Sequence, residues 1–178
     1  MKRIIFPAIV TGILLFTLSI TRAANHALLI GIGSYPGLSA MQQLEGPPFD
    51  VESLRNVLEK SFGFPPANVT TLVNGQASRT GILNALDNLV PATKPDDFIF
   101  LYFSGHGTSS YDPDRKEWGL DPLSGALMPS DFKTGEIKDM VAQLIIGTRD
   151  IKPRLMKLDK DRRILAVFDA CFSELTVR

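Results

Sequence analysis

Cysteine and histidine are scarce in this chain, with one Cys and two His among 178 residues. A lone cysteine has no partner for an intramolecular disulfide, and these three side chains give poor support for tetrahedral zinc. Neither sign of charge is in excess, because 19 basic residues stand against 19 acidic ones. The balance gives no electrostatic basis for nucleic acid as a partner. Cys171 is therefore a candidate free, reactive thiol.

Low-complexity tracts are absent, and the longest apolar stretch lies at the N-terminus. Lys2-Arg3 precede a mostly apolar stretch from Ile4 to Ile20, which is followed by Thr21-Arg22-Ala23-Ala24. This pattern is typical of a secretory signal peptide over residues 1–23, cleaved after Ala23, and it predicts an exported protein, periplasmic or secreted. The alternative is an uncleaved anchor, and only then is the membrane a partner.

A phosphate-binding glycine loop is also missing. Gly31-Ile32-Gly33 continues into Ser34-Tyr35-Pro36-Gly37 instead of opening a helix, so the strand-turn-helix context of a dinucleotide site is absent. The remaining composition, 44% hydrophobic and 21% charged, is ordinary for a single α/β domain. Residues 24–178 are predicted to form that domain.

Six large apolar residues, Phe98–Phe103, form the strongest strand signal in the chain. The run is too short for a typical helix and reads as a central parallel strand buried on both faces. It ends in Ser104-Gly105-His106-Gly107, where the flanking glycines permit unusual backbone angles or a close approach. A histidine that merely completes a loop is the alternative for His106. The other histidine, His26, is expected to be a solvated terminal residue.

A second apolar run, Arg163–Phe168, ends in Asp169-Ala170-Cys171. Ligand crevices of open parallel sheets lie outside the carboxyl ends of the strands, so His106 and Cys171 are expected to meet there. A thiol needs a base or a positive neighbour to become a thiolate near neutral pH, and a nearby histidine supplies one. The two motifs together predict a Cys-His dyad.

From residue 27 to the His106 motif the pattern predicts alternating strands and helices, which indicates a parallel sheet. Asp50 is expected to cap the helix that follows it, and Asp150 to cap a helix that places Pro153 in its first turn. Residues 108–131 are expected to form a surface excursion, with a small hairpin as one interpretation. Their aspartates and Glu117 could hold calcium, but the spacing matches no EF-hand loop, and a solvated acidic loop is preferred. The expected elements are strands 27–33, 68–73, 98–103 and 163–168 and helices 51–58, 78–89 and 151–158.

The motifs resemble those of the caspase-like cysteine peptidases, of the metacaspase type. Ser104-Gly105-His106-Gly107 matches the family's Ser-Gly-His-Gly, and Asp169-Ala170-Cys171 matches its Asp-Ser/Ala-Cys. Leu44-x-Gly46-Pro47-Pro48-Phe49-Asp50-Val51 is similar to Leu-x-Gly-x-x-Asn-Asp-Ala, with Phe49 in place of asparagine. The resemblance covers about residues 25–175 and implies a three-layer caspase-like fold, with a mainly parallel sheet flanked by helices.

The resemblance implies an endopeptidase in which Cys171 attacks the scissile carbonyl and His106 activates the thiol or protonates the leaving amine. The backbone amides of Gly107 and Cys171 would bind the oxyanion. Asp50 and Asp169 would line the pocket for the residue before the cut and favour Arg or Lys, which replaces the capping role preferred for Asp50 on local grounds. No cofactor is implied beyond the calcium already weighed.

The chain departs from the family at Phe172-Ser173-Glu174, where relatives usually have His-Ser-Gly. Family domains also continue with further strands and helices after the cysteine, so the domain is expected to be incomplete at its C-terminus. A complementing chain or downstream segment is then a candidate partner, besides a protein or peptide substrate. The alternative function is a non-catalytic caspase-like interaction module that binds peptides or a partner chain.

Overall fold

The computed structural model of the chain describes residues 23–171. The predicted signal peptide, apart from Ala23, and the departure at Phe172-Ser173-Glu174 lie outside the described residues. Between residues 23 and 171, no helix is both long and apolar enough to cross a membrane.

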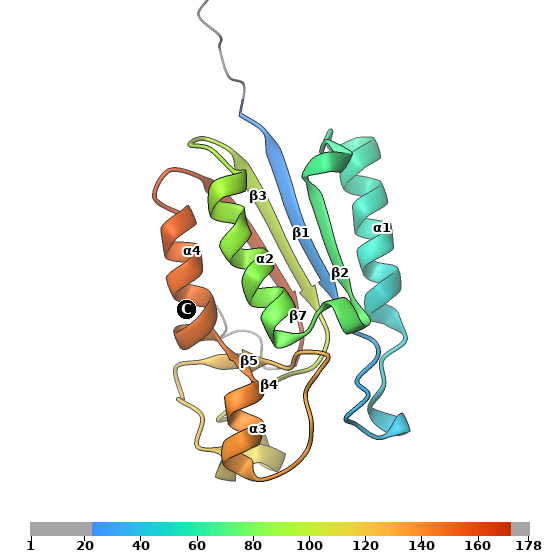
Figure 1. Ribbon diagram of the computed structural model, residues 1–178, viewed down its shortest axis with the longest axis vertical. Coiled ribbons are helices and arrows are strands. Elements are labelled where there is room, and N and C mark those ends of the chain that lie inside the picture. The colour runs from blue at the N-terminus through green and yellow to red at the C-terminus, as the bar shows by residue number, and fades with distance from the viewer. Residues whose placement is uncertain (1–22, 172–178) are drawn as a thin grey trace, which may run out of the picture.

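A four-stranded parallel sheet forms the centre of the molecule, in the order β2-β1-β3-β7 (Figure 1). All three neighbouring pairs are parallel, as the alternation of strands and helices predicts. The carboxyl ends of the strands therefore share one edge, the lower one in Figure 1. The strands are β1 (Asn25–Gly31), β2 (Val69–Val73), β3 (Phe98–Ser104) and β7 (Arg163–Asp169).

Helices cover both faces of this sheet, which confirms the three-layer α/β architecture (Figure 1). One helix packs on one face, and two helices lie side by side on the other. The first is α1 (Gly46–Ser61), and the pair is α2 (Arg79–Ala92) and α4 (Lys152–Leu158). Short helical turns occupy Ala40–Gln42, Pro66–Asn68, Asn74–Gln76, Pro113–Trp118 and Gly147–Ile151.

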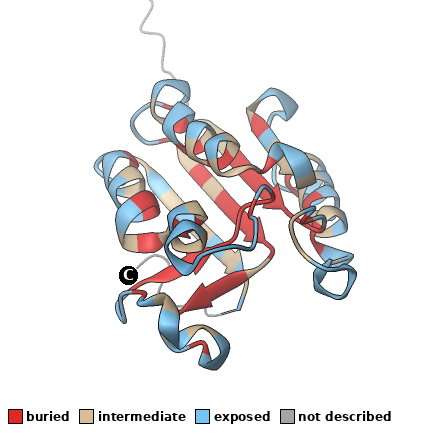
Figure 2. Ribbon diagram, turned by 60° about the horizontal axis from the view of Figure 1, so that its bottom comes forward, coloured by how far each residue is buried: buried red, intermediate tan, exposed pale blue. Residues whose placement is uncertain are grey.

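Alternation along the strands divides the buried side chains between these two layers. In β1, Ala27 and Leu29 pack with α1, whereas Leu28 and Ile30 belong to the cluster under α2 and α4. Strand residues alternate between faces, so a strand buried on both faces reads as a continuous apolar run. Figure 2 shows the result, with buried residues through the middle of the sheet and exposed residues on the outer faces of the helices.

A second, smaller sheet lies below the carboxyl edge of the parallel sheet (Figure 1). Strand β4 begins directly after His106 and pairs with β5 in antiparallel fashion, so the hairpin expected in the excursion is present. The sequence patterns missed α3 and β6, which complete this layer. The elements are β4 (Gly107–Ser109), β5 (Gly125–Leu127), α3 (Ile137–Gln143) and β6 (Ile145–Ile146).

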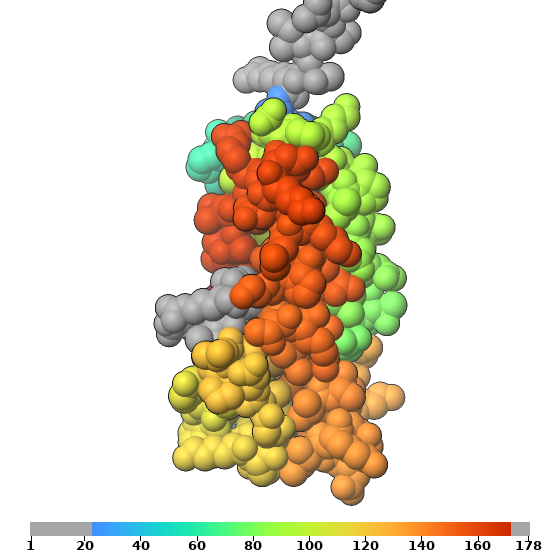
Figure 3. All heavy atoms as spheres, turned by 90° about the vertical axis from the view of Figure 1, so that its left-hand side faces the viewer, coloured from blue at the N-terminus to red at the C-terminus, as the bar shows by residue number. Residues whose placement is uncertain are grey.

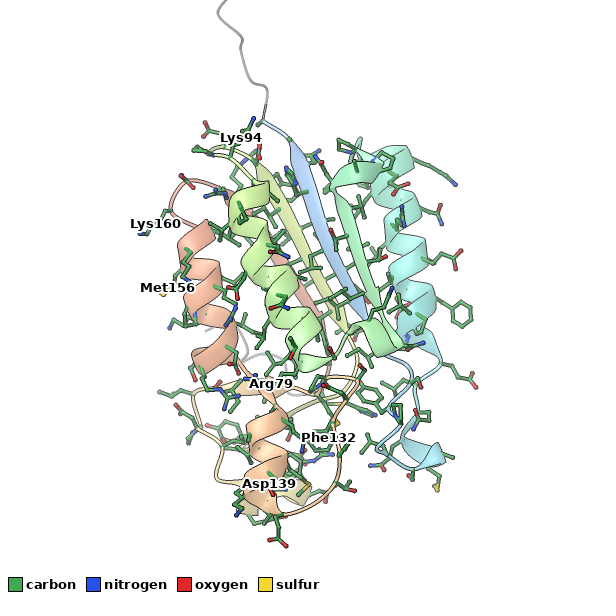
Figure 4. All side chains as sticks on the ribbon, viewed as in Figure 1. Arg79, Lys94, Phe132, Asp139, Met156 and Lys160 are labelled. Carbon is green, nitrogen blue, oxygen red and sulfur yellow. The ribbon has the colours of Figure 1, made fainter. Side chains whose placement is uncertain are left out.

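Asp150 is buried between two arginines, so its predicted role as the cap of α4 is wrong. Its carboxylate lies 3.1 Å from Arg79 and 2.8 Å from Arg149, and it accepts a hydrogen bond from the amide of Ile146. Burial alone would raise the pKa of Asp150, but the arginines and the amide lower it. Arg79, at the start of α2, reaches toward the lower layer (Figure 4), so this ion pair ties that layer to the main sheet.

Candidate active site

The ends of β3 and β7 bring the two sequence motifs side by side. Ser104 is in register with Asp169, and the amide of Gly105 donates to the carbonyl oxygen of Asp169 at 3.2 Å. A Cβ atom on Gly107 would collide with the carbonyl oxygen of Cys171. The segments that carry His106 and Cys171 are thus in backbone contact, at the edge of the sheet where the sequence places them.

The flanking glycines are required by this close approach and not by unusual backbone angles. A Cβ atom on Gly105 would lie 2.6 Å from the hydroxyl oxygen of Tyr35, and Gly107 abuts Cys171. Within the described part of the chain, positive φ angles among the glycines occur at Gly63 and Gly119, far from this motif in the sequence. The sequence allowed either unusual backbone angles or a close approach at these glycines, and the structure supports the close approach.

A cleft of about 600 Å³ opens at this edge of the sheet. All four side chains predicted for the site line it: Asp50, His106, Asp169 and Cys171. Gly107 lies behind them against Cys171. The remaining lining residues are Leu44, Glu45, Gly46, Pro47, Ser104, Gly105 and Ala170.

The ring of His106 is held by a main-chain carbonyl. Its Nε2 atom lies 2.7 Å from the carbonyl oxygen of Gln42, in the loop between β1 and α1. A carbonyl oxygen only accepts hydrogen bonds, so Nε2 carries the proton and Nδ1 keeps its lone pair in the neutral ring. The same carbonyl also stabilises the ring when it is positively charged. His106 is thereby prepared to accept a proton at Nδ1.

The backbone of His106 is fixed from two further directions. Its amide donates to the hydroxyl oxygen of Tyr35 at 2.9 Å, and its carbonyl oxygen accepts from the amide of Met128 at 3.0 Å. Tyr35 is fully buried, and its ring packs against the imidazole with centroids 4.8 Å apart. Burial raises the pKa of Tyr35 above its usual range, although the bond from His106 opposes this. The hydroxyl stays neutral and available as an acceptor.

Asp50 lies inside α1 and faces the cleft, so the local prediction that it caps the helix is wrong. The helix begins four residues earlier, at Gly46, because Pro47 and Pro48 fit its first turn, where backbone amides have no partner within the helix. The Asp50 carboxylate accepts a hydrogen bond from the hydroxyl of Ser104 at 3.4 Å. Asp50 therefore stands on the wall of the cleft opposite β7.

Three carboxylates line the cleft and make it electronegative: those of Glu45, Asp50 and Asp169. Burial raises the pKa of Tyr102, and the charges of Asp50 and Asp169 raise it further, while a hydrogen bond with Ser104 lowers it. The hydroxyl group of Tyr102, on β3, is therefore close enough to Asp50 and Asp169 for the charges of both carboxylates to affect its pKa. Cys171 lies at the same opening with an exposed side chain and is a free cysteine. The cleft combines an exposed thiol, a positioned imidazole and negative charge.

Sequence reasoning missed Tyr35, the Gln42 carbonyl and Ser104. Tyr35 and Gln42 belong to a loop whose sequence shows no periodic pattern, and a carbonyl group is available from every residue type. Ser104 belongs to the histidine motif, but its bond to Asp50 spans 54 positions in the chain. No local signal identifies such a contact.

The acidic loop after the histidine is only partly solvated. Asp112 is buried, contrary to expectation, and its carboxylate accepts hydrogen bonds from Thr108, at 2.9 Å, and from Arg115. Burial alone would raise the pKa of Asp112, but these bonds lower it. Across residues 23–171, no three His, Cys, Asp or Glu side chains gather closely enough to hold a metal ion.

Comparison with known proteins agrees with the two motifs. The family model described as "Metacaspase, peptidase C14 domain" matches residues 25–178. The chain belongs to the metacaspase family. It is 33% identical over 156 residues to Metacaspase-1 of Eremothecium gossypii, covering 84% of this chain and 32% of that protein. It is also 33% identical over 132 residues to Metacaspase-7 of Arabidopsis thaliana, covering 70% of this chain and 32% of that protein.

The chain spans about a third of the length of these curated metacaspases. Among solved structures, protein GSU0716 from Geobacter sulfurreducens superposes with a TM-score of 0.60 at 22% identity. That match covers 83% of this chain and 50% of the other. The likeness supports the caspase-like fold seen here.

Proposed function

We propose that this chain is a cysteine-type endopeptidase that uses Cys171 as nucleophile and His106 as its acid and base. The observation that carries the proposal is the orientation of His106. Nε2 is committed to the Gln42 carbonyl, the lone pair on Nδ1 is free, and the segment bearing the thiol lies in backbone contact with Gly107. Family membership supports the same chemistry.

The proposed reaction begins when Nδ1 of His106 takes the thiol proton of Cys171. The thiolate sulfur then attacks the scissile carbonyl carbon and forms a tetrahedral oxyanion. The carbon–nitrogen bond breaks as the imidazolium returns its proton to the departing amine, which leaves a thioester on Cys171. Water, losing a proton to His106, attacks this thioester and releases the acid product and the thiol.

Oxyanion stabilisation is assigned to the backbone amides of Gly107 and Cys171. Amides that are already in place stabilise charge that develops in the transition state, because they need not reorganise. The contact between Gly107 and Cys171 supports this assignment by placing the two backbones side by side.

Substrate preference for Arg or Lys before the cut is proposed from Asp50 and Asp169. Both line the cleft, and both raise the pKa of Tyr102 through their charge. A carboxylate binds a guanidinium through paired, charge-assisted hydrogen bonds, and an acidic substrate side chain would be repelled. Protein or peptide substrates with basic side chains are therefore the proposed class. Export through the N-terminal segment of residues 1–23 would place this activity outside the cytoplasm.

A partner-binding role is a second candidate, favoured by the exposed face of β7. Leu165 and Val167 are 50% and 38% exposed, and β7 lies at the edge of the sheet as far as the described residues extend. A strand edge with apolar flanks can accept a further strand. A complementing segment, or a peptide bound without cleavage, would use this surface.

One labelling experiment tests the enzyme proposal. The chain is treated with an electrophile that carries arginine before its reactive group, or with a matched aspartate reagent, and adducts are located by mass spectrometry. Selective modification of Cys171 by the arginine reagent is expected. Equal labelling by both reagents would contradict the specificity proposal, and labelling that is no faster than that of a free thiol would contradict the dyad. Peptide binding that survives in Cys171→Ala without any cleavage by the wild type would favour the second candidate.

A further inference from the structure

Gln43, a residue outside both catalytic motifs, connects two of the three hydrogen-bonding groups that hold His106, the Gln42 carbonyl and the Tyr35 hydroxyl. We propose that Gln43 is a positioning residue for His106, acting through the loop of residues 33–44, here named the supporting loop. The proposal rests on the function proposed above. It adds a residue that neither touches the substrate nor reacts, and that determines which nitrogen of the imidazole carries the proton.

The side-chain amide of Gln43 closes the supporting loop onto itself. Its oxygen accepts from the amide of Tyr35 at 2.7 Å. Its nitrogen lies 3.0 Å from the carbonyl oxygen of Tyr35, 3.3 Å from that of Leu38 and 3.0 Å from that of Ser39. All four of these hydrogen-bond contacts are directed at the backbone of the supporting loop.

Two of the groups that hold His106 are direct neighbours of Gln43. The Gln42 carbonyl, which binds Nε2, belongs to the preceding residue. Tyr35, whose hydroxyl accepts from the His106 amide, is the residue that the Gln43 side chain binds through both amide and carbonyl. The Gln43 amide thus fixes the distance between the two supports. Without it, no side chain among the described residues bonds directly to the backbone of Tyr35, and Gln42 is held within the loop by its own bonds to Ser39.

The base of the supporting loop is anchored independently of Gln43. The side-chain oxygen of Asn74 accepts from the amides of Gly33, at 2.8 Å, and Ser34, at 3.0 Å. The amide of Leu44 donates to the carbonyl oxygen of Gly33 at 2.9 Å. Further along the loop, Gly37 forms a bridge with Lys133, the residue after the buried Phe132. Loss of the Gln43 amide is therefore expected to loosen the tip of the loop while the fold remains.

A second glutamine supplies a matched control. The side chain of Gln143 accepts from the amide of Lys133 at 2.7 Å and donates to the carbonyl oxygens of Lys133, at 3.1 Å, and Asp139, at 3.0 Å. This is the same chemistry as at Gln43, but Gln143 is the last residue of α3. Gln143 has no hydrogen bond to His106 or to Tyr35 among those of the described residues. Gln143→Ala removes hydrogen bonds of the same kind but leaves those of Gln43 to Tyr35 in place. Because Lys133 bridges Gly37, this variant also tests whether loosening the supporting loop from outside is enough to affect the ring.

The ring nitrogens of His106 give a readout that needs no activity. With ¹⁵N-labelled histidine the full chain shows only two imidazoles, because it contains two histidines. His26 serves as an internal reference, since it pairs with Asp97 in a different part of the fold. In the wild type at neutral pH, the ¹⁵N shifts are expected to report a proton on Nε2 of His106. In Gln43→Ala they are expected to move toward a mixture of tautomers, with His26 unchanged.

The thiol gives the second readout. Gln43→Ala is expected to lower the alkylation rate of Cys171 about tenfold at neutral pH and to displace its pH profile, because one hydrogen bond to the imidazole is no longer maintained. Gln43→Glu replaces the donor nitrogen by an oxygen that faces three carbonyl oxygens, so it is expected to lower the rate at least as much as Gln43→Ala does. Gln143→Ala is expected to lower the melting temperature by a few degrees, as Gln43→Ala does, without either effect at the site.

Two results would overturn the proposal. One is a wild-type tautomer for His106 in Gln43→Ala, whatever the alkylation rate. The other is an equal change in the His106 shifts in Gln143→Ala, which would show general loosening. Failure of the proposed function looks different. In that case Cys171 of the wild type reacts no faster than a free thiol, while the His106 shifts still respond to Gln43→Ala alone.

Discussion

Strands β3 and β7 are parallel neighbours of seven residues each, and each ends at one member of the proposed dyad, yet their surroundings differ. β3 is flanked by strands on both sides, and its side chains are mostly buried. β7 alternates exposed and half-buried residues along its whole length. In Figure 3 the helix α4 covers the outer side of this part of the molecule, so β7 is covered mainly on the face toward α4.

The difference extends to the catalytic residues themselves. His106 donates to the Tyr35 hydroxyl and to the Gln42 carbonyl, both in the supporting loop, and accepts from the amide of Met128, directly after β5. Cys171 has an exposed side chain and rests on the backbone of Gly107. The histidine half of the site is thus rigidly built, and the thiol half is open to reagents. This arrangement suits a nucleophile that must meet a large substrate.

Substitution of the dyad residues gives the largest expected effect. Cys171→Ala is expected to abolish labelling by an electrophilic peptide, and His106→Ala to slow it about 100-fold or more, because general acid and base assistance contributes factors of that order. Rates from mass spectrometry at pH 7 provide the measurement. His26→Ala is the control and should label at nearly the wild-type rate. Equal rates for wild type and His106→Ala would show that the two strand ends do not cooperate.

Two leucines, one on each strand, test the difference in burial between β3 and β7. Leu101 of β3 is 2% exposed and Leu165 of β7 is 50% exposed. Leu101→Ala leaves a cavity in the core and is expected to lower the free energy of unfolding by about 2–5 kcal/mol. Leu165→Ala should change it by less than about 1 kcal/mol. Urea titration of both variants measures the difference, and similar losses would mean that β7 is covered in solution.

Single substitutions of Asp50 and Asp169 test which of these two carboxylates selects the substrate. Asp50→Asn is expected to reduce the preference for the arginine reagent over the aspartate reagent about tenfold. Asp169→Asn should have a smaller effect, because Asp50 is held by Ser104 whereas Asp169 lies on the exposed strand. Competition labelling gives the ratio directly. An unchanged ratio in Asp50→Asn would assign selectivity elsewhere.

The smallest expected effect is on stability and concerns Asp97, which directly precedes β3 at the end away from the cleft. Asp97 accepts from the amides of Ala24, at 2.7 Å, and Lys94, at 2.8 Å, and pairs with His26 at 3.3 Å. Burial alone would raise the pKa of Asp97, but these partners lower it. A carboxyl with a lowered pKa stabilises the fold above about pH 4, and its contribution is lost as the pH falls further.

Asp97→Asn is therefore expected to lower the free energy of unfolding by about 1 kcal/mol at pH 7 and to flatten its decline in acid. Urea titrations between pH 3 and pH 7, roughly spanning the carboxyl range, measure this. Asp87→Asn removes a partly exposed ion pair with Arg154 and should leave the acid slope unchanged. If the free energy of unfolding of Asp97→Asn still falls with pH as steeply as that of the wild type, groups other than Asp97 cause the loss of stability in acid.

The sequence patterns located the strands well because each is a short apolar run bounded by turn residues. They erred where polar residues have distant partners. His26 was expected to be solvated, yet it pairs with Asp97, 71 positions later in the chain (97 − 26). Asp50 and Asp150 were interpreted as caps from their neighbours alone, whereas their partners come from Ser104 and from Arg79. Helix α3 was missed because it has seven residues and no buried residue to create a pattern.

The sequence by itself determined which residues end the two central strands, and therefore that one thiol and one imidazole meet at a single sheet edge. That follows from local rules, since apolar runs form buried strands and parallel strands share their carboxyl ends. Only the tertiary structure decided how the imidazole is held, through the Gln42 carbonyl, the Tyr35 hydroxyl and the Gln43 amide. The two contacts with His106 span 64 and 71 positions of the chain and come from a loop without a periodic pattern, so no local signal in the sequence indicates them.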